Sequence, residues 1–125
     1  MENLVNALKE HIDIPAIEAN SLSPLVLAYI GDSVYDLVIK MVSVSGGSAH
    51  VNKLHQRTSH YVKAVSQAII IRALEPQLTE EEVRIYKRGR NAKFYTKPKN
   101  VTVSEYNQAT GFEALIGYLF LTGRY

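Results

Sequence analysis

The stretch that decides the fold is SPLVLAYIGDSVYD, residues 23–36. Ser23 followed by Pro24 is typical of a helix start, and the apolar residues that follow have helical spacing. Asp32 is the only charged residue from position 19 to position 35. A buried, ionised carboxylate without a partner is costly, so such a group is paired, neutralised or bound to a metal ion. Few cations lie nearby in the sequence, which makes a divalent cation a serious candidate partner.

A second acid stands in a similar setting in ATGFEALIGYLFL, residues 109–121. Glu113 is the only charged residue between Glu105 and Arg124. Two glycines accompany the two acids: Gly31 adjoins Asp32, and Gly117 lies four residues after Glu113.

A glycine inside a helix costs about 1 kcal/mol relative to alanine, so Gly31 and Gly117 require a reason. Close approach of two helix backbones is a sufficient one. If the two helices cross at these glycines, Asp32 and Glu113 can point into one small site. Two carboxylates from different helices, with water in the remaining positions, suit Mg²⁺ or Mn²⁺.

The composition is that of one compact domain, residues 1–125, with 46% hydrophobic residues. No stretch approaches the roughly 20 apolar residues of a membrane span, and the N-terminus lacks a secretory signal. Cysteine is absent, which excludes disulfides and thiolate metal sites. The expected compartment is the cytoplasm.

Basic residues are concentrated between Arg84 and Lys99, where there are seven and no acidic residue, although the net charge is only +2. Such a block is either an ordinary solvated loop or a surface that meets a polyanion. The absence of acids favours RNA, whose phosphates and 2′-hydroxyls can be contacted by Lys, Arg and Asn. The candidate RNA-binding residues are Lys87, Arg88, Arg90, Asn91, Lys93, Lys97 and Lys99.

The hydrophobic pattern predicts an all-α fold. Helices are expected over residues 1–12, 24–42, 52–74, 79–89 and 104–121, with a turn over 43–48 and a basic loop over 89–103. The helix over 24–42 carries apolar residues on more than one side. Its stripe consists of Leu27, Ile30, Val34, Leu37, Val38 and Met41.

Two motifs resemble the ribonuclease III family. LAYIGDSVY, residues 27–35, is similar to the family signature, and FEALIG, residues 112–117, to its second acidic motif. The short chain, without a C-terminal double-stranded-RNA-binding domain, and the segment KRGRNAK, residues 87–93, resemble the Mini-ribonuclease III subfamily in particular.

This resemblance implies a homodimeric, all-helical endonuclease that cuts double-stranded RNA with Mg²⁺, for which Mn²⁺ is a potential substitute. It implies products with a 5′-phosphate, a 3′-hydroxyl and a short 3′ overhang. Asp32 and Glu113 carry over as catalytic, metal-binding acids. The usual substrate of the subfamily is the precursor of 23S ribosomal RNA, and ribosomal proteins are candidate helpers. Because severing a duplex requires two scissions, a two-fold dimer provides two equivalent sites, with the helix over 24–42 as the expected interface.

The chain departs from full-length ribonuclease III at two acidic positions, where it has Ala28 and Thr110. Both departures are typical of the short subfamily. Thr110 and Asp36 are therefore candidates for a supporting role around the metal, although Asp36 can equally face solvent. Two alternatives remain at this point: a non-catalytic module that binds double-stranded RNA or the ribosome and retains the fold, and a helical protein-interaction domain.

Overall fold

The regular elements in the described part of the chain are all helical, which confirms the all-α prediction. The computed structural model describes residues 4–12, 17–45, 53–54, 63–92 and 102–124. The α-helices are α1 (Leu4–His11), α2 (Pro24–Ser45), α4 (Ala64–Leu74), α5 (Glu80–Arg90) and α6 (Val103–Leu121). Two single-turn 3₁₀ helices, η1 (Ala19–Ser21) and η2 (Glu75–Gln77), precede α2 and α5. No helix among these residues is long and apolar enough to cross a membrane.

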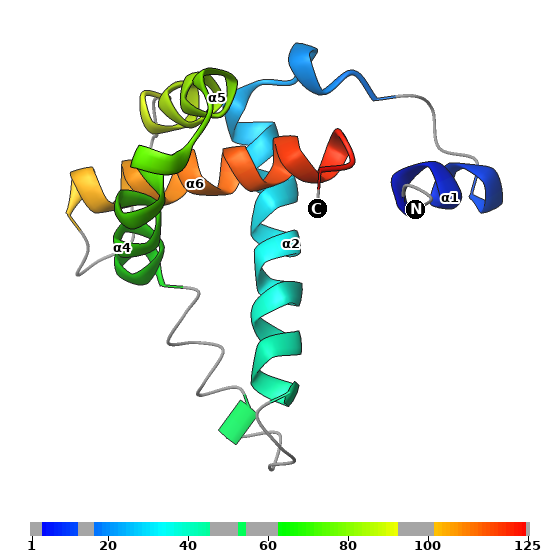
Figure 1. Ribbon diagram of the computed structural model, residues 1–125, viewed down its shortest axis with the longest axis horizontal. Helices are drawn as coiled ribbons and strands as arrows, with labels where there is room; N and C mark the ends of the chain where they lie inside the picture. The colour runs from blue at the N-terminus through cyan, green and yellow to red at the C-terminus, as the bar shows by residue number, and fades with distance from the viewer. Residues whose placement is uncertain (1–3, 13–16, 46–52, 55–62, 93–101, 125) are drawn as a thin grey trace.

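Helix α6 is the centre of the fold and packs against α2, α4 and α5 (Figure 1). Its buried residues are Ala109, Thr110, Gly111, Phe112, Ala114, Leu115, Gly117 and Tyr118. The ring of Phe112 meets the ring of Tyr35 on α2 edge-to-face, with the centroids 5.4 Å apart. Figure 1 also shows that α2 crosses α6 and extends well beyond the crossing, away from the other described α-helices.

Side-chain caps set the starts of three helices. Thr79 and Glu82 form a reciprocal capping box at α5, which the sequence predicts, and Thr102 and Glu105 form another at α6. Helix α6 therefore begins one residue earlier than expected. The Ser23 hydroxyl accepts a hydrogen bond of 3.3 Å from the backbone N–H of Val26, as a helix N-cap does.

Two predicted boundaries are wrong. Residues 43–45 continue α2 instead of starting a turn. The Ser43 hydroxyl donates to the carbonyl of Ile39 and the Ser45 hydroxyl to that of Val42, so both hydroxyls find hydrogen-bond acceptors on the helix itself. The predicted helix over 52–74 is not continuous, because Lys63 has an extended backbone and caps α4. The buried residues of α4 lie on the helix that packs against α6. Helix propensity is a local quantity and does not predict such a contact between distant segments.

The predicted apolar stripe of α2 is only partly buried. Leu27 is buried, together with Ala28, Gly31 and Tyr35, and this face meets α6. By contrast, Leu37 and Met41 are about 60% exposed. The stripe therefore covers two faces of α2, of which one belongs to the core and one lies on the surface.

Candidate active site

The two acid-bearing helices cross at the two glycines, as the sequence predicts. A Cβ built on Gly31 would lie 1.7 Å from the backbone oxygen of Glu113, and a Cβ on Gly117 would lie 2.0 Å from the backbone oxygen of Leu27. No side chain fits at such distances. The backbones of α2 and α6 therefore touch here, and this crossing brings Asp32, next to Gly31, close to Glu113, one turn before Gly117.

Asp32 from α2 and Glu113 from α6 line one open pocket of about 300 Å³. The other residues that line it are Leu25, Ala28, Tyr29, Tyr106 and Thr110. The carboxyl groups of Asp32 and Glu113 are close enough to share a hydrogen bond. The structure thus brings together the two residues that the sequence nominates as catalytic, while their chemical role stays a prediction.

The surroundings of Glu113 in this pocket disfavour its ionised form. Burial, a hydrogen bond with Asp32 and the negative charge of Asp32 together raise the pKa of Glu113 from 4.5 to about 9. Without a cation, Glu113 thus holds a proton at neutral pH. A divalent cation between the two carboxyl groups would favour the ionised form of Glu113.

The raised pKa of Glu113 predicts the pH dependence of stability in the metal-free protein. The folded state keeps a proton on Glu113 between about pH 4.5 and pH 9, whereas the unfolded chain releases it, so the free energy of unfolding falls as pH rises through this window. Glu113→Gln removes the effect. In EDTA at pH 8, we expect the variant to be more stable than the parent by on the order of 1–3 kcal/mol.

Urea unfolding at pH 5, 7 and 8.5 measures this difference. We expect the two proteins to converge at pH 5 and to diverge with rising pH. Mg²⁺ should reduce the difference, because it stabilises the parent alone. Parallel pH profiles in EDTA would show that Glu113 does not carry the proton.

The structure separates the two supporting candidates. Thr110 is buried, lines the pocket and donates from its hydroxyl to the backbone oxygen of Tyr106 at 3.1 Å. Its hydroxyl oxygen can still accept a hydrogen bond. Asp36 does not line the pocket; its carboxylate forms an ion pair of 2.8 Å with Lys40 on the surface of α2. A supporting role of Asp36 stays a prediction.

The candidate RNA-binding residues within the described chain lie at the end of α5. Lys87, Arg88 and Arg90 belong to its last turn, and Asn91 is its C-cap. Lys93, Lys97 and Lys99 lie outside the described residues, as does most of the predicted loop.

A third close approach brings this turn against α6. A Cβ on Gly89 would lie 2.8 Å from Gly111 Cα and 3.3 Å from the backbone oxygen of Thr110. Because Thr110 lines the acidic pocket, the cations that flank Gly89 lie on the element next to it. The last turn of α5 is thus in backbone contact with the part of α6 that carries Thr110.

Two features of the site were not recognised in the sequence. One is Tyr106, which lines the pocket. It precedes Thr110 by four residues and Glu113 by seven, which places all three on one helix face, so this spacing could have predicted it. Gln67 of α4 is 2% exposed and hydrogen-bonds with Glu113. A lone glutamine in an apolar run could not reveal that partner.

The all-helical fold and most of the chain length belong to a ribonuclease III domain. The ribonuclease III domain family matches residues 25–124. A crystal structure of a protein from Fusobacterium nucleatum superposes with a TM-score of 0.74 at 33% identity, covering 82% of this chain and 81% of that one.

Relatives with curated names identify the group within this family to which the chain belongs. Mini-ribonuclease 3 of Thermoanaerobacter sp. (strain X514) is 52% identical over 105 residues, covering 84% of this chain and 74% of the relative. Mini-ribonuclease 3 of Clostridium tetani is 47% identical over 105 residues, covering 83% and 70%. The chain therefore belongs to the Mini-ribonuclease 3 group of the ribonuclease III family and is an endoribonuclease.

Proposed function

We propose that this endoribonuclease cuts double-stranded RNA by Mg²⁺-dependent hydrolysis at the pocket formed by Asp32 and Glu113. The observation that carries the proposal is the contact between these two carboxyl groups at the crossing of α2 and α6. Hydrolysis would leave a 5′-phosphate, a 3′-hydroxyl and a short 3′ overhang. The family membership favours this reading over a non-catalytic module that retains the fold.

The donor set of the pocket fits Mg²⁺. This ion is usually held by one or two carboxylates, with water and substrate phosphate completing its coordination. Asp32 and Glu113 would supply the two carboxylates, and no cluster of three or more His, Cys, Asp or Glu gathers in the described part of the chain. When bound, Mg²⁺ would activate water and stabilise charge on the leaving oxygen. The open pocket leaves room for an RNA phosphate.

The basic turn of α5 would hold the RNA backbone beside this pocket. Lys87 and Arg88 are exposed, and Arg90 is half-buried with its guanidinium over the ring of Tyr86. The backbone contact of Gly89 with α6 sets the position of the turn relative to the acids. This arrangement recognises phosphate positions more than base identity.

Neutralising Lys87, Arg88 and Arg90 together should weaken binding of duplex RNA and flatten its salt dependence. Each lost phosphate contact lowers the slope of log K against log salt by up to about 0.9, so we expect a decrease of about 1–3. Lys40→Gln is the control, because Lys40 lies on α2 and already forms an ion pair with Asp36 on the same helix. Filter binding from 50 to 300 mM KCl measures both slopes. An unchanged slope in the triple variant would assign RNA binding to other residues.

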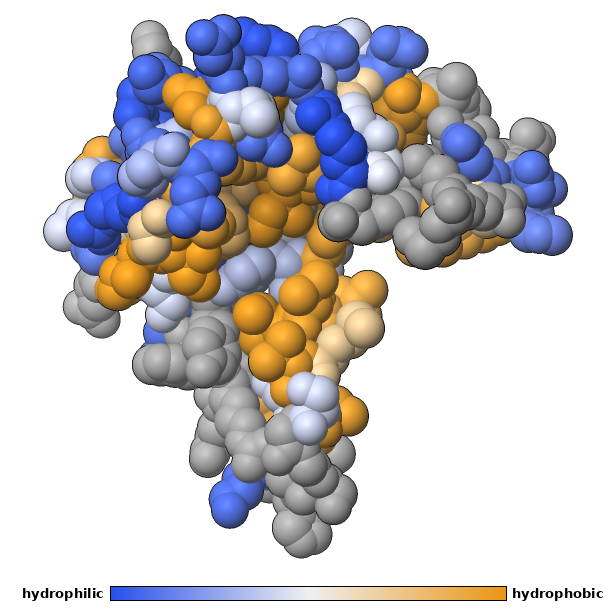
Figure 2. Space-filling model, viewed as in Figure 1, coloured by the Kyte–Doolittle hydropathy of each residue, from blue (hydrophilic) through white to orange (hydrophobic). Residues whose placement is uncertain are grey.

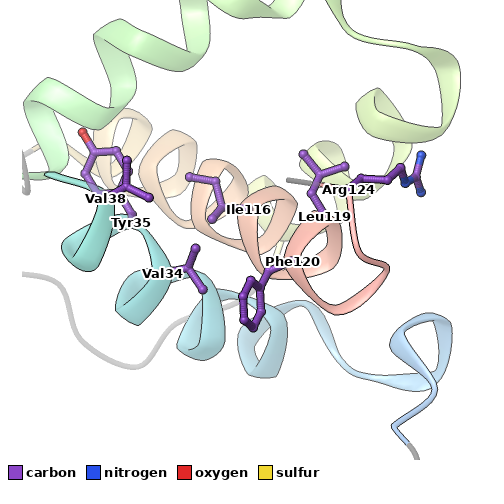
Figure 3. A pocket seen from close by; sticks show the side chains of 7 residues that line it. All are labelled: Val34, Tyr35, Val38, Ile116, Leu119, Phe120 and Arg124. Carbon is purple, nitrogen blue, oxygen red and sulfur yellow. The ribbon is translucent and has the colours of Figure 1, made fainter. Parts of the chain in front are cut away.

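The proposed assembly is a homodimer formed through the exposed apolar face of α2. We define this face by its exposed residues Leu37, Val38, Met41, Val42 and Val44. Figure 2 shows apolar side chains gathered along α2 below the crossing. Beside them lies an apolar pocket of about 270 Å³ between α2 and α6, in which Val34 and Val38 lie opposite Ile116 and Phe120 (Figure 3). Continuous apolar surface of this kind favours burial against another chain, and a second copy would place a second site on the opposite strand.

Leu37→Asp combined with Met41→Asp should convert the dimer to monomers. Each new aspartate would be an unpaired buried charge in the proposed interface, whereas on a monomer its carboxylate would stay in water. Size-exclusion chromatography with light scattering measures the mass, which we expect to fall to half. Val103→Asp is the control, because Val103 is 58% exposed and lies on another helix. A parent protein that is already monomeric, or a double variant that stays dimeric, would contradict this interface.

The natural substrate we propose is the precursor of 23S ribosomal RNA in the cytoplasm, with ribosomal proteins as candidate helpers. This proposal is supported by similarity to the Mini-ribonuclease 3 relatives and by the basic last turn of α5.

End-labelled duplex RNA and single-stranded RNA of the same sequence test the activity, each with Mg²⁺ or EDTA. We expect discrete products from the duplex with Mg²⁺ alone. Equal cutting of single strands, or cutting in EDTA, would contradict the proposed reaction.

A further inference from the structure

Gln67 is a polar side chain in a place where apolar groups are the rule. It lies on α4, is 2% exposed and belongs to the largest fully buried side chains of the described residues. Its neighbours on the buried face of α4 are Ala68 and Ile71. A primary amide carries two N–H donors and an acceptor oxygen, and burying it is costly unless these groups are hydrogen-bonded. A leucine or methionine would fill a similar volume without this cost.

The partner of Gln67 is the acid of the candidate active site. Gln67 hydrogen-bonds with the side chain of Glu113, and α4 packs against α6. In this contact an amide N–H of Gln67 donates and a carboxylate oxygen of Glu113 accepts. Gln67 does not line the pocket that holds Asp32 and Glu113. Glu113 thus contacts Asp32 from α2 and Gln67 from α4.

We propose that Gln67 is a positioning residue for Glu113. Its amide occupies one carboxylate oxygen of Glu113 and leaves the other for a divalent cation shared with Asp32. This inference rests on the proposed metal site and deepens it, because Gln67 would not touch the cation or the RNA. A hydrogen bond to a ligand carboxylate restricts its orientation, and loss of such a partner costs about 10–100-fold in metal affinity or activity.

Gln67→Met tests the proposal, because methionine has a similar length and no amide. Two measurements apply: the Mg²⁺ concentration that gives half-maximal cleavage of duplex RNA, and the Mn²⁺ concentration that is needed for a given rise in Tm over the value in EDTA. We expect the variant to need about 10–100-fold more metal in both, with a Tm in EDTA equal to or above that of the parent. Ile71→Val is the control, because it removes a buried methylene from the same helix and should lower the Tm without changing either metal requirement.

The outcomes separate this inference from the proposed function. Unchanged metal requirements in Gln67→Met would overturn the positioning role, as would an equal change in Ile71→Val. A parent protein whose Tm responds to Mn²⁺ but which does not cut duplex RNA would overturn the proposed function, while the Tm titration would still decide the role of Gln67. A parent that shows no response to metal would overturn both.

Discussion

Glu113→Gln is expected to reduce cleavage of duplex RNA by about 10³-fold or more while leaving the protein folded. Glutamine keeps the size of the side chain but removes the charge that, with the charge of Asp32, would hold the divalent cation. Loss of charge stabilisation in a transition state costs several kcal/mol, and each 1.36 kcal/mol is a factor of ten in rate. Single-turnover cleavage with RNA bound in excess protein measures the chemical step.

Two controls distinguish this loss from damage to the fold. RNA affinity should stay within about threefold of the parent, because the proposed phosphate contacts lie on α5. The stability in EDTA should rise at pH 8, because burial and Asp32 raise the pKa of Glu113 to about 9. A variant that retains full activity would remove Glu113 from the active site.

Gly31→Ala is expected to destabilise the protein by about 3 kcal/mol or more, although alanine is the better helix former. The added Cβ would lie 1.7 Å from the backbone oxygen of Glu113 and 2.9 Å from the backbone nitrogen of Gly117. Backbone atoms cannot move aside as a flexible side chain can, so α2 and α6 must separate. We expect the Tm to fall by about 10 °C or more and cleavage to fall with it.

Ser33→Ala is the matched control, because Ser33 is exposed on the same helix two residues away. It introduces the same helix-forming residue without a steric conflict and should leave the Tm unchanged or slightly raised. A Gly31→Ala variant as stable as the parent would show that the helices are not in backbone contact at this point.

The crossing of α2 and α6 could be predicted because glycines in helix interiors have few explanations. Gly31 and Gly117 each stand one turn or less from a lone acid, and close packing accounts for both. The capping box of Thr79 and Glu82 was also predictable, because it depends only on two residues three positions apart in the sequence.

The remaining features depend on contacts between segments distant in the sequence. The hydrogen bond from Gln67 to Glu113 requires α4 to pack on α6, and the break at Lys63 precedes the part of α4 that does so. The exposed members of the α2 stripe, Leu37, Val38 and Met41, are as apolar as the buried Leu27. Periodicity alone cannot distinguish an apolar face that enters the core from one that lies on the surface.

The most direct test of the central claim is a double-mutant cycle on cleavage of duplex RNA, with Asp32→Asn, Glu113→Gln and the double variant in Mg²⁺. If the two carboxylates act as one metal site, removing either should cost nearly as much as removing both. We predict that the double variant is no more than about tenfold slower than the slower single variant. Losses that multiply in the double variant, or near-parental cutting by either single variant, would contradict a shared site.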